Sequence, residues 1–251
     1  MKFPEIVIVG GTKCGTTAMW YNLDKHPDIH MAMKSQSSIE MNFWKGRKWK
    51  MGIEWYKKRF PNDKVGGEKT AGYFVNKSAF KQMKKHIPDV KLIYCVRNPV
   101  DRAYSNFQMN KKAGKVSVFD MNTFKKRYGG HGKYINFIEN NILKFFDEDQ
   151  LYISVMEKMK NDPSNEMKKV FEFLGVSDLK LPKKVIGGVL LKDRSRKEDV
   201  VLNRKEKFYR VWSKHTDVLS GKMRKEILNY YKPFNKKLFK FIGYEIKEWR
   251  K

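Results

Sequence analysis

The sequence contains few cysteines and no long hydrophobic run. Only two of its 251 residues are cysteine, Cys14 and Cys95, which excludes the dense disulfide framework of small secreted domains. No apolar stretch approaches the about 20 residues that a membrane-spanning helix needs. The first apolar run begins only a few residues after Met1, which leaves no room for a signal peptide or a membrane anchor. We therefore expect a cytoplasmic protein without an anchor, in which both thiols are free.

Acidic residues are scarce relative to basic ones. The 27 aspartates and glutamates stand against 54 lysines and arginines, which gives a formal net charge of +27. Such a charge favours anionic partners, whether a nucleotide, an acidic polysaccharide, nucleic acid or a membrane surface. Lysine accounts for 43 of the basic residues and is spread along the whole chain, so part of the excess is a bias of composition. No recognition motif for nucleic acid and no histidine spacing typical of a metal site is present.

The chain also lacks a linker rich in proline, glycine or serine, and it has no internal repeat. We therefore predict one domain over residues 1–251. The predicted strands cover residues 5–9, 91–96 and 150–155, and the predicted helices cover 16–26, 76–87, 98–112, 132–146, 164–174 and 221–241. Alternating strands and helices predict an α/β fold of the P-loop type, a parallel sheet with helices on both faces.

A glycine-rich loop follows the first predicted strand. The β-branched run of residues 6–9 suits a strand that is buried on both faces, and glycines such as Gly11 and Gly15 let the backbone turn tightly and approach a ligand. The next helix points its free N–H groups at this loop, which makes an anion site. The spacing resembles a phosphate-binding P-loop, but Thr16 stands at the usual lysine position and the lysine is Lys13. This displacement argues against an ordinary Mg²⁺-dependent nucleoside triphosphatase.

A second phosphate-binding element is predicted at the end of another strand. The apolar run 92–96 ends at Arg97, and ligands of open α/β sheets collect beyond the carboxyl ends of the strands. Pro99 suits the first position of the next helix, and Ser105 falls two helical turns beyond Asn98. Arginine is suited to bidentate recognition of phosphate, whereas a Walker B strand would end in an acid that holds Mg²⁺. We therefore predict a phosphate site without metal.

Together the two elements resemble those of sulfotransferases that use 3′-phosphoadenosine-5′-phosphosulfate (PAPS). The resemblance rests on segment 11–17, Gly-Thr-Lys-Cys-Gly-Thr-Thr, and segment 97–105, Arg-Asn-Pro-Val-Asp-Arg-Ala-Tyr-Ser. The branch that they resemble is the heparan sulfate type, which modifies carbohydrates. Shorter matches occur at residues 26–29, 67–70, 161–163 and 171–175, and residues 231–249 are similar to the family's C-terminal helices.

The resemblance implies a role for each segment. The first would bind the 5′-phosphosulfate end of PAPS through Gly11, Thr12, Lys13, Cys14, Gly15, Thr16 and Thr17. The second would bind the 3′-phosphate through Arg97 and Ser105. Lys13 would also act in catalysis, because a phosphate leaves during sulfuryl transfer and a cation stabilises the charge that grows on it. The product of PAPS would be 3′-phosphoadenosine-5′-phosphate (PAP), and no metal would be needed.

Transfer to a hydroxyl also needs a general base. Residues 34–44 resemble the family segment Lys-Glu-x-His-Phe-Phe, whose glutamate is the base, and Glu40 aligns with that glutamate. The segment departs from the pattern because about five residues separate Lys34 from Glu40 and because Asn42 replaces the histidine. A solvated loop glutamate is the alternative interpretation. Lys69 matches a family lysine near the acceptor and is a third candidate catalytic residue, with a buried pair or a surface role as alternatives.

These features predict a PAPS-dependent sulfotransferase with a small-molecule or oligosaccharide acceptor. One alternative is a P-loop kinase, which would bind Mg²⁺-ATP through a Walker B acid. The other is a catalytically silent protein that binds a nucleotide or a polyanion. Glu54 and Glu68 are the nearest alternative bases to Glu40. The sequence does not indicate the identity of the acceptor, the position that is sulfated, the choice between oxygen and nitrogen, or the oligomeric state.

Overall fold

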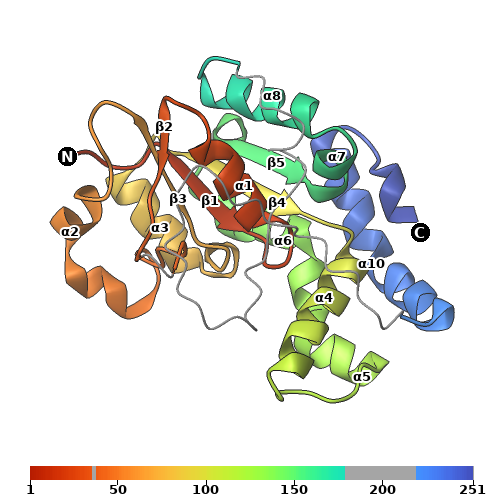
Figure 1. Ribbon diagram of the computed structural model, residues 1–251. Helices are drawn as coiled ribbons and strands as arrows, with labels where there is room; N and C mark the ends of the chain where they lie inside the picture. The colour runs from red at the N-terminus through yellow and green to blue at the C-terminus, as the bar shows by residue number, and fades with distance from the viewer. Residues whose placement is uncertain (36–37, 179–218, 251) are drawn as a thin grey trace, which may run out of the picture.

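The protein contains one sheet of five strands in the order β2-β3-β1-β4-β5 (Figure 1). The computed structural model describes residues 1–35, 38–178 and 219–250. The strands are β1 (Ile6–Gly10), β2 (Ile29–Met31), β3 (Val65–Lys69), β4 (Lys91–Val96) and β5 (Leu151–Val155). Every pairing between neighbouring strands is parallel. Their carboxyl ends therefore lie at one edge of the sheet, where both predicted phosphate elements begin.

The strand order places helices on both faces of the sheet. From β1 the chain passes over β3 to β2 through α1 (Thr16–Asp24), whereas the later connections run in the opposite direction across the sheet. Because crossovers between parallel strands are right-handed, the two directions put their helices on opposite faces. In Figure 1 α1 lies in front of the strands, and α3 (Lys77–His86) and α6 (Tyr134–Phe137) lie behind them. The predicted α/β class is confirmed, and β1 stands where the direction reverses, the usual place for a ligand.

Three of the five strands follow the sequence prediction, and β2 and β3 were missed. All residues of β1 are buried, as its β-branched run indicated. β3 has the sequence Val-Gly-Gly-Glu-Lys, which carries no apolar pattern. A Cβ atom at Gly67 would lie 2.3 Å from the Met31 sulfur of β2, so packing against the neighbouring strand requires glycine there. β2 has only three residues, too few to show the alternation of apolar and polar residues that predicts a strand.

The long helices agree with the prediction. Besides α1 and α3 they are α4 (Pro99–Lys112), α8 (Pro163–Leu174) and α10 (Gly221–Ile242). The Asp162 side chain caps α8 by accepting from the Asn165 N–H at 3.2 Å, and Gly175 ends the helix in a left-handed conformation with φ 73°. The helix predicted over 132–146 is instead the short α6 followed by a π-helical turn over Ile138–Ile142.

Several short elements had no signal in the sequence. They are α2 (Ile53–Lys57), α5 (Met121–Thr123), α7 (Met156–Asn161), the 3₁₀ turns Gly46–Met51, Tyr73–Val75, Gly130–Gly132, Glu148–Gln150 and Lys247–Arg250, and a π-helical turn over Phe124–Tyr128. α10 packs against α4 and α6 and closes a second apolar cluster beside the main core. Within the described residues, no helix combines the length and apolar character needed to cross a membrane.

Candidate functional site

The loop between β1 and α1 presents backbone N–H groups. Gly15 is the N-cap of α1 with φ 86°, a left-handed conformation that glycine adopts without strain. No side chain in the described part of the chain caps this helix, and the first N–H groups of a helix have no partner within it. Thr16 is buried and Thr17 is partly buried at this end. The positive end of α1 therefore faces the loop and favours an anion, as the sequence predicted.

The second element lies directly against this loop. The Gly11 N–H donates to the Cys95 carbonyl oxygen of β4 at 2.7 Å, and Arg97 Nη1 donates to the Lys13 carbonyl oxygen at 3.3 Å. Burial, followed by the positive charge of Arg97, lowers the pKa of Lys13. Two neighbouring cations repel each other, and a bound anion would remove that repulsion. The structure thus unites two elements that lie about eighty residues apart in the sequence.

Two polar atoms at this junction indicate what the site can hold. Thr12 Oγ1 and Arg97 Nε are buried and have no hydrogen-bond partner among the described residues. Buried polar atoms are normally paired, and the oxygens of a phosphate would accept from both. The donors, the helix end and the two cations therefore suit a phosphate-bearing ligand.

α4 extends from the second element. The Asn98 side chain caps α4 by accepting from the Val100 N–H at 3.0 Å, with Pro99 at the first helical position. Ser105 lies on the second turn of this helix and is 7% exposed. It belongs to the helix that begins directly after the residue pair Arg97-Asn98.

Glu40 reaches the phosphate loop through one lysine. The Lys69 ammonium, at the end of β3, donates to the Glu40 carboxylate in a short ion pair. The same ammonium lies 3.2 Å from Thr17 Oγ1, and the Ala71 N–H donates to the other Glu40 oxygen at 2.9 Å. The Glu40 side chain is 32% exposed and that of Lys69 is 4% exposed, so the carboxylate remains accessible. Of the predicted segment 34–44, residues 36 and 37 lie outside the described residues.

Glu68 has a different environment, although it neighbours Lys69 in the sequence. Successive side chains of a strand point to opposite faces, and Glu68 is fully buried. Its carboxylate accepts from three hydroxyls, Tyr56 at 2.7 Å, Tyr73 at 3.0 Å and Thr70 at 3.0 Å. Burial raises the pKa of Glu68 to about 7, against the opposite effect of these hydrogen bonds. A carboxylate with this environment supports structure and has no access to an acceptor.

The hydroxyls around Glu68 hold the segment that carries Glu40. The Asn42 N–H donates to Thr70 Oγ1 at 2.7 Å, and the Trp44 N–H donates to the Tyr73 hydroxyl at 3.1 Å. The Trp44 indole donates to the Tyr56 hydroxyl at 3.0 Å. The buried carboxylate therefore holds the segment that carries Glu40 through these hydroxyls, a role that the sequence did not reveal.

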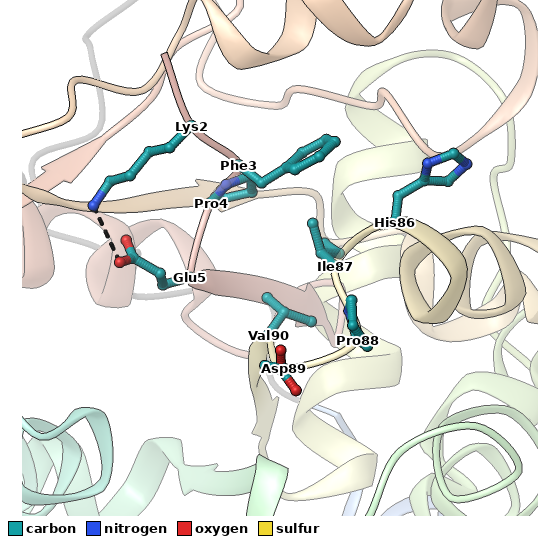
Figure 2. A pocket seen from close by; sticks show the side chains of 9 residues that line it. All are labelled: Lys2, Phe3, Pro4, Glu5, His86, Ile87, Pro88, Asp89 and Val90. Atoms are coloured by element: carbon teal, nitrogen blue, oxygen red, sulfur yellow. Dashed lines mark hydrogen bonds and ion pairs between the residues drawn. The ribbon is translucent and has the colours of Figure 1, made fainter.

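The remaining candidate carboxylate and a hollow beside the N-terminal residues lie away from the phosphate elements. The Glu54 side chain is 69% exposed and pairs with Lys57, which is the environment of a surface residue. Figure 2 shows a hollow lined by residues 2–5 and 86–90, which precede β1 and β4 or end α3. Because the strands are parallel, this hollow is at the sheet edge opposite the phosphate loop. In the described ranges no group of three metal-ligating side chains occurs.

Known proteins share sequence similarity with this chain. A family model for the sulfotransferase domain matches residues 3–186. Mouse (Mus musculus) bifunctional heparan sulfate N-deacetylase/N-sulfotransferase 4 is 31% identical over 196 residues, which cover 69% of this chain and 22% of that protein. Human (Homo sapiens) heparan sulfate glucosamine 3-O-sulfotransferase 3B1 is 26% identical over 258 residues, which cover 97% of this chain and 64% of that protein.

A solved structure has the same fold. The sulfotransferase from Alicyclobacillus acidocaldarius superposes with a TM-score of 0.73 at 19% identity, and the match covers 100% of both chains. This likeness concerns the fold alone. The match spans less than a quarter of each bifunctional relative, with 23% of the Xenopus laevis bifunctional heparan sulfate N-deacetylase/N-sulfotransferase 1 covered.

Proposed function

Because the chain belongs to the sulfotransferase domain family, we propose that it transfers a sulfuryl group from PAPS to a carbohydrate-like acceptor. The observation that carries the proposal is the contact between the two anion-binding elements, in which Arg97 donates to the Lys13 backbone. One element alone would suit many nucleotides. The pair suits an adenosine nucleotide with phosphates at both the 5′ and the 3′ positions, which distinguishes PAPS and PAP from ATP and ADP.

The residues around α1 would hold the reacting end of PAPS. The free N–H groups at the start of α1, with the Thr16 and Thr17 hydroxyls, would bind the 5′-phosphate. Lys13 would donate to the oxygen that leaves with the phosphate, so its contribution would grow as charge develops there. When bound, PAPS supplies an activated sulfuryl group. Preorganised donors can stabilise this transfer without a metal ion.

Glu40 would accept the proton of the acceptor. Its carboxylate is oriented by the Lys69 ammonium and the Ala71 N–H. Among the three candidate carboxylates, Glu40 combines solvent access with a connection to the phosphate loop through Lys69. Lys69, placed between Glu40 and Thr17, would position the base relative to the sulfuryl donor. This arrangement supports a direct in-line transfer.

The acceptor class is inferred from the relatives and from charge. Relatives named for heparan sulfate N- and 3-O-sulfotransfer and a net charge of +27 support an anionic oligosaccharide. A carboxylate base is compatible with transfer of the sulfuryl group to oxygen and with transfer to nitrogen. We also propose a cytoplasmic location, because Cys14 and Cys95 are free thiols; cell fractionation tests it.

Calorimetric titration with PAP and with ADP tests the nucleotide. PAP should bind more tightly, because only PAP has a 3′-phosphate for Arg97 and Ser105. Arg97→Ala should remove most of that preference, about tenfold or more in affinity for one charge-assisted contact. Arg59→Ala, which removes an arginine stacked on Trp55 at 4.4 Å, is the matched control. Equal affinity of the unmutated protein for PAP and ADP would contradict the proposal.

Turnover of PAPS with glycosaminoglycan oligosaccharides tests the base. Glu40→Gln keeps the shape of the side chain and should lower kcat by about 10²- to 10⁴-fold while PAP affinity is retained. Glu54→Gln is the exposed control and should keep full turnover. If Glu40→Gln were fully active, the base would have been misassigned, and if the unmutated protein bound PAP but transferred nothing, the protein would be a silent nucleotide binder.

A further inference from the structure

The peptide bond between Arg97 and Asn98 is held from both sides. The Tyr134 hydroxyl donates to the Arg97 carbonyl oxygen at 2.7 Å. The Asn98 N–H donates to Glu157 Oε1 at 2.9 Å. This peptide bond determines where the Arg97 side chain starts and where α4 begins. The positions of Arg97 and of Ser105 on α4 therefore both depend on it.

Trp249, near the end of the described chain, contacts both partners of this peptide bond. Its indole N–H donates to Glu157 Oε2 at 2.9 Å, and its ring packs on the Tyr134 ring with centroids 5.8 Å apart. Trp249 is 3% exposed and Tyr134 is 1% exposed. The two oxygens of Glu157 thus accept from two N–H groups that belong to segments about 150 residues apart.

Tyr134 also contacts the first phosphate element. Its hydroxyl oxygen lies 3.5 Å from Cys14 Sγ. The Tyr134 hydroxyl donates its hydrogen to the Arg97 carbonyl oxygen, and the Cys14 thiol donates to the Thr12 carbonyl oxygen at 3.6 Å. Burial raises the pKa of Cys14 to about 11, which keeps the thiol protonated and able to donate. One hydroxyl therefore connects the phosphate loop to the end of β4.

We propose that Tyr134, Glu157 and Trp249 form a positioning network that sets the affinity of the second element for the 3′-phosphate. None of the three needs to touch the nucleotide. They hold the backbone from which Arg97 projects, and a guanidinium forms bidentate bonds to phosphate only when its position is well defined. This inference rests on the proposed function, in which the 3′-phosphate is bound by Arg97 and Ser105.

The alternative is a purely structural role, in which Trp249 only attaches the C-terminal segment to the domain. The two roles differ in what they change. A structural role affects stability and would weaken all ligands together, whereas a positioning role affects the 3′-phosphate selectively. The ratio of the affinities for PAP and ADP separates them, because ADP lacks the 3′-phosphate and shares the remaining groups.

Three conservative variants test the network. Tyr134→Phe removes the hydroxyl and keeps the ring, Trp249→Phe removes the indole N–H, and Glu157→Gln replaces one accepting oxygen by a donating amide. Tyr94→Phe is the matched control, because Tyr94 is fully buried beside Tyr134, with ring centroids 6.1 Å apart, and its hydroxyl has no hydrogen-bond partner among the described residues.

Calorimetry should show PAP affinity reduced about tenfold in each network variant, with ADP affinity changed by less than about twofold. In PAPS turnover, KM should rise with kcat nearly unchanged, and Tyr94→Phe should match the unmutated protein. Glu157→Gln combined with Trp249→Phe should be less than additive, because both remove the same bond. Thermal melting checks that each variant is folded, and the two variants that keep the Trp249 ring carry the test if Trp249→Phe does not fold.

The outcomes separate the network from the function on which it rests. If the unmutated protein prefers PAP and all three variants keep that preference, or weaken PAP and ADP equally, the network proposal is overturned and the proposed function stands. If the unmutated protein has no preference for PAP, the proposed function fails and the network proposal fails with it.

Discussion

Glu68→Gln should change how the stability of this protein depends on pH. Glu68 is fully buried in the fold, and burial raises its pKa from an ordinary value of 4.5 to about 7. Between these two values the folded protein keeps a proton on Glu68 that the unfolded chain has lost. The free energy of unfolding should therefore fall as the pH rises through this window, since raising the pH penalises the state that binds more protons.

The size of the effect follows from the width of the window. Each pH unit changes the free energy by about 1.4 kcal/mol for one proton, so the shift of Glu68 predicts a loss of about 3 kcal/mol between pH 4.5 and 7. Below the window the stability due to Glu68 is fully present, and above it that stability is gone. Glutamine does not titrate, so the variant should lack this contribution entirely.

Urea unfolding followed by tryptophan fluorescence, repeated between about pH 4 and pH 8, measures the difference. Subtracting the Glu68→Gln curve from that of the unmutated protein cancels the other titrating groups and any constant loss of hydrogen bonding. Glu54→Gln, at an exposed glutamate, should give a curve parallel to the unmutated one. A difference that does not vary with pH would refute the reasoning, and a difference of opposite slope would show that the three hydroxyl donors outweigh burial.

Three further predictions concern the site and the core. PAP affinity should fall as the pH rises into the alkaline range, because burial and the charge of Arg97 lower the pKa of Lys13. The Lys13 ammonium then loses its charge at a lower pH than a surface lysine, and calorimetry should find no such fall in affinity for Lys13→Met. Sulfuryl transfer should survive EDTA, since the residue that follows β4 is Arg97 and not the acid of a Walker B strand, and a loss that Mg²⁺ restores would contradict this. Gly132→Ala should lower the free energy of unfolding by about 1–3 kcal/mol, because its Cβ would lie 2.6 Å from the Tyr231 side chain; in chemical denaturation Gly130→Ala, with open space around its Cβ, is the control.

The sequence by itself determined the parts of this protein that depend on neighbouring residues. The buried run before Gly10, the tight turn at Gly15 and the arginine that follows β4 each lie within a short segment, and each is found where predicted. The helix α8, capped by Asp162 and ended by Gly175, is likewise a local feature that is found where predicted. Strand periods, caps and glycine turns are local properties of the backbone, so a pattern of a few residues suffices to predict them.

Only the tertiary structure decided which side chains act together. The sequence favours Glu40 over Glu54 and Glu68 only through a family resemblance, and packing gives the three carboxylates different environments: paired at the phosphate loop, exposed, and fully buried. Tyr134 and Trp249 gave no signal as partners of the second phosphate element. Burial, charge and hydrogen-bond partners arise from segments far apart in the chain that the sheet brings to one edge, and no local pattern contains that information.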